Sequence, residues 1–78
     1  MPSRVGITTN PESRRKHWES RVEGLINWRI LTSFQSQSEA QRYENDYAAR
    51  HNCNAWPGGP DTPGTWYVYF FDYTRDLG

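Results

Sequence analysis

The chain has 78 residues, a length that supports one domain with a thin hydrophobic core, and its nine basic and nine acidic residues cancel. A dedicated nucleic-acid binder usually carries a clear basic excess, so the overall charge argues mildly against one. The single cysteine, Cys53, excludes an internal disulfide, and no apolar run is long enough for a signal peptide or a membrane span. We therefore expect one cytoplasmic domain over residues 1–78, with no membrane partner and a core rich in aromatic side chains.

The first half of the chain predicts a strand, a helix and a second strand. Residues 4–9 are β-prone. Asn10 can cap a helix and Pro11 suits its first position, and apolar residues at helical spacing carry this helix to about residue 25. Residues 28–34 form the second predicted strand, with alternate side chains on one face: Trp28, Ile30 and Phe34.

The second half predicts a helix, a loop and a central strand. Ser38 with Gln41 matches a capping box and starts a helix that runs to about Arg50. Three prolines and three glycines between residues 52 and 65 predict a loop. Residues 65–73 are almost continuously apolar, as in a strand covered on both faces. The predicted order is β-α-β-α-β, an α+β arrangement in which two helices flank a three-stranded sheet.

Two motifs resemble GIY-YIG nuclease domains. Residues 6–15, Gly-Ile-Thr-Thr-Asn-Pro-Glu-Ser-Arg-Arg, are similar to the signature that opens that family's first helix, with the same eight-residue step from Gly6 to the essential arginine, here Arg14. In the second helix, Ala40-Gln-Arg-Tyr-Glu44 resembles the Ala-x-x-x-Glu that contains the family's metal-binding glutamate. Trp28, in a strand between the two helices, adds to the match.

The family's first strand is missing from its usual place, because only three residues precede Arg4. The C-terminal strand, Trp-Tyr-Val-Tyr-Phe-Phe at residues 66–71, resembles that missing strand. Joining the chain ends in thought restores the family's hairpin, so the resemblance implies a circularly permuted GIY-YIG-like fold with a three-stranded antiparallel sheet. It predicts that strand 66–73 lies directly beside strand 4–9, antiparallel to it, with the chain ends adjacent.

The candidate site combines an arginine, a carboxylate and phenols. Arg14 lies four residues before Trp18 on the inward side of the first helix, and Glu44 lies on or beside the inward stripe of the second. Such a set suits phosphodiester hydrolysis, with Glu44 holding Mg²⁺, Arg14 neutralising charge on the phosphate, and a phenol positioning water. The resemblance assigns the phenol to Tyr69, and Tyr67, on the same strand face, is a substitute. Nearby basic side chains are candidates for nucleic-acid contacts: Arg15, Lys16 and Arg21.

Each assignment has a structural alternative. Arg14 could pair with Glu44 or Glu12, Tyr69 could be a core aromatic, and the basic cluster could be an ordinary solvated helix face. His17 lies three residues after Arg14, whereas some family nucleases use a histidine four residues on, so we expect it to be exposed.

One departure separates the chain from the family, because Arg4-Val5-Gly6 stands where the family has Tyr-Ile-Gly. Arginine stays protonated in proteins and is a poor general base. Two functions are therefore expected. The first is a Mg²⁺-dependent endonuclease or nucleic-acid-processing module; the alternative is a catalytically inactive GIY-YIG-fold module that binds protein or nucleic acid.

Overall fold

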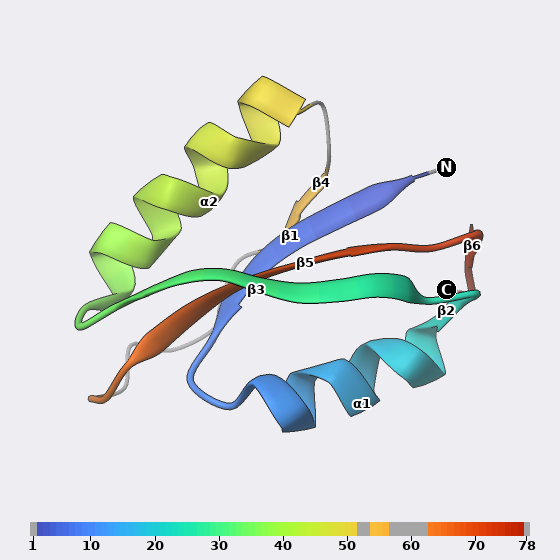
Figure 1. Ribbon diagram of the computed structural model, residues 1–78, viewed down its shortest axis with the longest axis horizontal. Coiled ribbons are helices and arrows are strands. Elements are labelled where there is room, and N and C mark those ends of the chain that lie inside the picture. Colours follow the sequence, from blue (N-terminus) through green and yellow to red (C-terminus); the bar gives the residue numbers. More distant parts are fainter. Residues whose placement is uncertain (1, 52–53, 57–62, 78) are drawn as a thin grey trace.

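The computed structural model describes residues 2–51, 54–56 and 63–77. A twisted main sheet lies between two helices (Figure 1). In chain order the elements are β1 (Ser3–Thr8), α1 (Pro11–Arg21), β2 (Val22–Glu23), β3 (Ile26–Phe34), α2 (Gln37–His51), β4 (Asn54–Trp56), β5 (Trp66–Asp72) and β6 (Arg75–Asp76). The predicted α+β fold, with a three-stranded antiparallel sheet and two helices in the order β-α-β-α-β, is confirmed, and β2, β4 and β6 are short additions to it.

The C-terminal strand β5 is the centre of the main sheet, whose order is β3-β5-β1-β4. β5 runs antiparallel to β1, with Phe70 opposite Val5, and antiparallel to β3 on its other side. The expectation that the last strand lies directly beside the first is therefore confirmed. The start of the described chain lies beside the end of β5, where the Tyr73 N–H donates to the Pro2 carbonyl at 3.0 Å. The terminal residues 1 and 78 lie outside the described residues.

The sheet buries a separate apolar cluster on each face. The side chains of β5 alternate between the two faces and so contribute to both clusters. On the α2 side the cluster contains Val5, Ile7, Ala40, Trp66 and Val68. On the α1 side it is mostly aromatic: Trp18, Val22, Tyr69, Phe71 and Tyr73. Full burial of one such side chain stabilises the fold by about 2 kcal/mol, so these few large residues compensate for the short chain. Figure 1 shows the two helices on opposite sides of the sheet.

Local chemistry sets the helix ends. Asn10 caps α1 as expected, because its side chain accepts from the Ser13 N–H at 3.2 Å. The helix ends at Arg21, earlier than predicted, since Val22 and Glu23 pair with β6 and Gly24 adopts a φ of 73°. At α2 the capping residue is Ser36, whose hydroxyl accepts from the N–H three residues on, so the helix begins before the predicted Ser38.

Two further expectations for the strands need correction. The segment predicted as a loop between residues 52 and 65 contains β4, which pairs parallel to β1; residues 52–53 and 57–62 of it lie outside the described residues. The predicted common face of β3 is wrong, because two register shifts interrupt its alternation. As a result Trp28 packs on the α1 side, Phe34 packs on the α2 side, and Ile30 is 41% exposed.

Across the described ranges, no helix has both the length and the apolar character needed to cross a membrane.

Candidate functional site

A polar cavity lies where β1 ends and α1 begins. It has a volume of about 310 Å³ and is lined by Thr8, Thr9, Asn10, Ser13, Arg14 and His17. The first turn of a helix carries partial positive charge, although in α1 Pro11 has no N–H group and the Ser13 N–H already donates to Asn10. A guanidinium, hydroxyl groups and a helix N-terminus together form surroundings that favour an anion. We call this hollow the Arg14 cavity.

The side chain of Arg14 is half-buried and forms no ion pair with any residue in the described part of the chain. Among the described residues, therefore, Arg14 pairs with neither Glu44 nor Glu12. The neighbouring loop is held in place by Thr8, which is 5% exposed and whose hydroxyl accepts from the Asn10 N–H at 3.0 Å. Arg14 thus lines the cavity as a charge without a counter-ion among the described residues.

His17 belongs to the same cavity, contrary to the expectation that it is exposed. Its side chain is half-buried, and its Nε2 atom is buried without a hydrogen-bond partner among the described residues. Burial, and then the charges of Arg14 and Arg21, lower the pKa of His17 below its ordinary value, so the imidazole is neutral at pH 7. Residues three apart are neighbours on a helix, which is why His17 lies beside Arg14.

Tyr69 is fully buried on the α1 side of the sheet. Its phenol oxygen accepts from Trp18 Nε1 at 2.9 Å, and its ring stacks on Trp28 with 4.9 Å between centroids. The phenol lies across Gly6 so closely that any side chain there would collide with it. Burial raises the pKa of Tyr69 to about 12, so the group holds its proton at neutral pH. This geometry favours the core-aromatic alternative; Tyr67 is half-buried and does not line the Arg14 cavity.

Glu44 is fully buried on α2, and α2 packs on the face of the sheet opposite to α1. Its Oε1 accepts from Gln41 Nε2 at 2.6 Å, while its Oε2 has no hydrogen-bond partner among the described residues. Burial raises the pKa of Glu44 to about 7, although the hydrogen bond from Gln41 opposes the rise. A large part of the Glu44 population is therefore neutral at physiological pH.

Arg14, Tyr69 and the predicted metal ligand Glu44 do not share one open surface. Arg14 lowers the pKa of Tyr69 and Glu44 raises it, so both charges act on the same phenol. Only Arg14 lines a cavity at this end of the sheet, because Tyr69 and Glu44 are both 0% exposed. What the arrangement offers to a ligand is the guanidinium with its hydroxyl and imidazole neighbours.

The resemblance implies a bound Mg²⁺ ion, and the described residues offer it one suitable ligand atom. The buried Oε2 of Glu44 lacks a partner, and a carboxylate oxygen is the ligand that Mg²⁺ prefers. The ion also keeps several water molecules, for which a fully buried carboxylate provides no space. Within the described ranges no group of three acidic, histidine or cysteine side chains could complete a site. The described residues therefore provide one protein ligand for Mg²⁺ and do not form a complete coordination shell.

Two of the three basic side chains expected to contact nucleic acid, Arg15 and Lys16, are exposed on α1 beside Arg14. Arg21 is half-buried at the end of that helix, and its carbonyl accepts from the Leu77 N–H at 2.9 Å. The exposed pair adds two positive charges to α1 outside the Arg14 cavity, whereas Arg21 is located near β6.

Arg4, which the sequence resemblance aligns with the tyrosine of Tyr-Ile-Gly, has a structural role. Its guanidinium forms a 2.6 Å ion pair with Asp76 and lies over the rings of Trp18 and Tyr73, at 5.1 and 5.5 Å from their centroids. The side chain is only 13% exposed. It therefore ties β1 to β6 and covers the aromatic cluster, a function that a tyrosine could not fill in the same way.

The chain matches no protein-family model, no curated protein and no solved structure. The likeness to GIY-YIG domains accordingly rests on the sequence motifs quoted above alone. The function has to be argued from the geometry of the Arg14 cavity and of the buried groups around Tyr69.

Proposed function

We propose that the protein is a nucleic-acid-binding module with a permuted GIY-YIG-like fold, which holds a backbone phosphate in the Arg14 cavity and does not depend on hydrolysis. The observation that carries this proposal is the lining of that cavity. Polar side chains surround one arginine, and this arginine has no counter-ion among the described residues. A phosphate oxygen supplies the negative charge that Arg14 lacks as a counter-ion, and it accepts hydrogen bonds from the hydroxyls of Thr9 and Ser13 beside the positive end of α1.

Three features favour binding over cleavage. The tyrosine position of the family holds Arg4, which already pairs with Asp76. The phenol of Tyr69 is buried and keeps its proton, so it is not available to activate water. Glu44 packs on the other face of the sheet and is fully enclosed. Each of these removes one component of the hydrolytic machinery while leaving the arginine in place.

Binding should be weak and sensitive to salt. Arg14, Arg15 and Lys16 can neutralise about three phosphates, which corresponds to a slope of about −2 in a plot of log K against log salt for a single strand. The acidic residues of α1, Glu12 and Glu19, are exposed on the same helix and limit the number of contacts. We therefore expect micromolar or weaker affinity at physiological salt, in keeping with the zero net charge.

Fluorescence anisotropy with labelled single-stranded and duplex oligonucleotides over a range of salt concentrations tests the proposal. The substitution Arg14→Ala should weaken binding by about tenfold, because it removes the central charge. The matched control is Arg42→Ala, which removes an exposed arginine from α2 and should change affinity by less than about twofold. Affinity that does not fall with salt, or that is equal in the two variants, would contradict phosphate binding in the Arg14 cavity.

Metal-dependent cleavage is the second candidate, and the unpartnered Oε2 of Glu44 favours it. Purified protein would be incubated with supercoiled plasmid or branched DNA in the presence of Mg²⁺ or Mn²⁺. Cleavage that disappears in Glu44→Ala supports the nuclease. Cleavage that survives in this variant excludes Glu44 as the metal ligand, and binding without any cleavage supports the non-catalytic module.

A further inference from the structure

A second hollow lies on the other side of the sheet, between the end of β3 and the first turns of α2. It has a volume of about 460 Å³ and is lined by Phe34, Glu39, Arg42, Tyr43 and Asp46. The rings of Phe34 and Tyr43 face one another at 5.8 Å with an interplanar angle of 52°. Tyr43 is 37% exposed, so the ring pair is open to solvent. This groove shares no residue with the Arg14 cavity.

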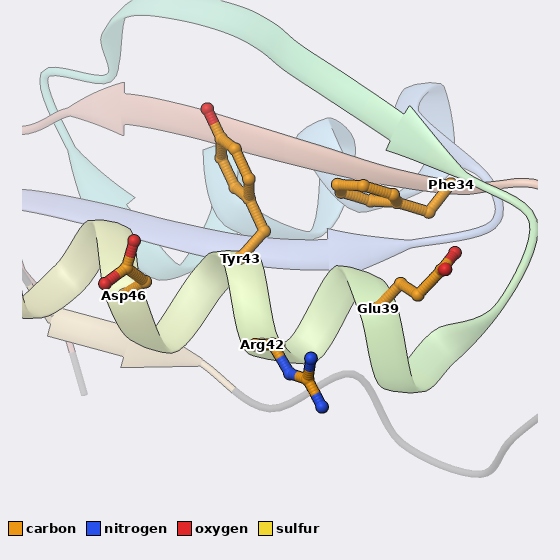
Figure 2. Close-up of a pocket in the computed structure, with 5 residues that line it drawn as sticks. All are labelled: Phe34, Glu39, Arg42, Tyr43 and Asp46. Atoms are coloured by element: carbon orange, nitrogen blue, oxygen red, sulfur yellow. The ribbon is translucent and has the colours of Figure 1, made fainter.

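The groove combines aromatic rings with carboxylates. Figure 2 shows the side chains of Glu39 and Asp46 on either side of Tyr43, on the same side of α2 as the rings, whereas Arg42 points away from them. Glu39, Tyr43 and Asp46 lie at positions i, i+4 and i+7 of α2, so they form one continuous stripe along the helix. Glu39 has no ion pair among the described residues, and Asp46 has only an exposed 3.2 Å pair with Arg50. A pair of that kind contributes little to stability and is easily displaced.

These groups match one kind of ligand. A planar cation stacks on the faces of aromatic rings and donates paired hydrogen bonds to carboxylates, and arginine does both better than lysine does. Two of the three charged side chains that line the groove, Glu39 and Asp46, are acidic, and the third, Arg42, points away from the rings, so the groove favours a cation over an anion. The contact between Arg50 and Asp46 indicates that a guanidinium can reach this carboxylate.

The length of the groove points to an extended chain. Beyond Tyr43 it continues into a smaller hollow of about 150 Å³, lined by Tyr43, Asp46, Tyr47, Arg50 and His51. The aromatic row continues with centroid distances of 6.2 Å from Tyr43 to Tyr47 and 4.1 Å from Tyr47 to His51. From Glu39 to His51 a helix rises about 18 Å, the span of five or six extended residues.

We propose that the groove between β3 and α2 binds an arginine-bearing extended segment of a partner protein, with the guanidinium against the rings of Phe34 and Tyr43 and its donors on Glu39 and Asp46. The remainder of the segment lies along the row formed by Tyr47 and His51. The groove is on the face opposite to the Arg14 cavity, so one module can hold nucleic acid and a protein at once.

NMR titration of ¹⁵N-labelled protein with short peptides tests this inference. The probe is an acetylated, amidated hexapeptide of glycine and serine with one central arginine, and its matched control carries citrulline, which has the same shape without the charge. We expect saturable shifts at Phe34, Tyr43 and Asp46 with the arginine peptide and at least about fivefold weaker binding of the citrulline peptide.

Two variants separate recognition from folding. The double variant Glu39→Gln/Asp46→Asn keeps the ring pair and should lower the affinity for the arginine peptide by about tenfold. The control Glu12→Gln/Glu19→Gln removes two exposed acids from α1 and should leave the affinity unchanged. The proposal is overturned if the arginine peptide causes no saturable shifts in the groove, if citrulline binds equally well, or if both double variants lose the same affinity.

Discussion

Replacing Glu44 with glutamine should make the protein more stable at neutral and alkaline pH. The side chain is fully buried with one oxygen unpartnered, and burial raises its pKa from an ordinary 4.5 to about 7. Between these two values the folded protein keeps a proton that the unfolded chain has released, so the free energy of unfolding falls as the pH rises. Above about pH 7 both states are ionised and the loss is complete.

The size of the effect follows from the two pKa values. One pKa unit corresponds to about 1.4 kcal/mol, so the ionised Glu44 destabilises the folded state by about 3 kcal/mol at most. Glutamine is uncharged and keeps the acceptor for Gln41 Nε2. We therefore expect Glu44→Gln to be about 1–3 kcal/mol more stable than the natural chain at pH 8, with a much smaller difference near pH 5.

Urea unfolding followed by tryptophan fluorescence between about pH 5 and pH 8 measures this difference, because Trp18 is buried in the folded state. Glu19→Gln, an exposed acid on α1, is the control and should follow the natural chain. Parallel stability curves for the natural chain and Glu44→Gln would refute the argument. Addition of Mg²⁺ at pH 8 adds a second readout: stabilisation that requires Glu44 would support the nuclease candidate, and no effect supports the binding module.

Two further substitutions test the core and the end of the central strand β5. Gly6→Ala should lower the free energy of unfolding by about 2 kcal/mol, because the added methyl group meets the phenol of Tyr69. In a Tyr69→Phe background, which lacks the hydroxyl, the same change should cost less stability. Equal losses of stability in the two backgrounds, measured by thermal unfolding, would contradict the close contact. Asp72→Asn should destabilise the protein at neutral pH. The hydrogen bonds from Ser3 and then Asn27 lower the pKa of Asp72 below 3.8, so its contribution is present above that value and is lost on further acidification. Unfolding in urea at neutral and at acidic pH checks this. If the variant loses as much free energy of unfolding on acidification as the natural chain does, the argument is wrong.

Local patterns were enough to predict the main elements. The cap at Asn10 and the apolar spacing locate α1, and the continuous aromatic run of residues 66–71 places β5 in the centre of the sheet. The strands β2, β4 and β6 have two or three residues each, too few for any periodicity to appear. The register shifts in β3 depend on how it pairs with a strand more than 30 residues away, so no window of sequence contains them.

The candidate site could be predicted only in part. The spacing from Gly6 places Arg14 in a cavity at the helix start, as a charged inward position suggests. The expectation that His17 is exposed is wrong, because a residue three positions after Arg14 lies on the same side of the helix as Arg14, as the residue four positions on does. That Glu44 lies on the opposite face of the sheet depends on the path of α2 over β1, which is set by tertiary packing.

The position of β5 has a consequence for how the protein folds during synthesis. The strands β1 and β3 are made first, but they are not neighbours in the sheet, because each pairs with β5. Until β5 has left the ribosome, β1 can gain backbone partners only from β4, and β3 has none in the main sheet. The antiparallel core therefore assembles late and around its last strand, so folding is dominated by distant contacts and the apolar faces of β1 and β3 stay exposed until then.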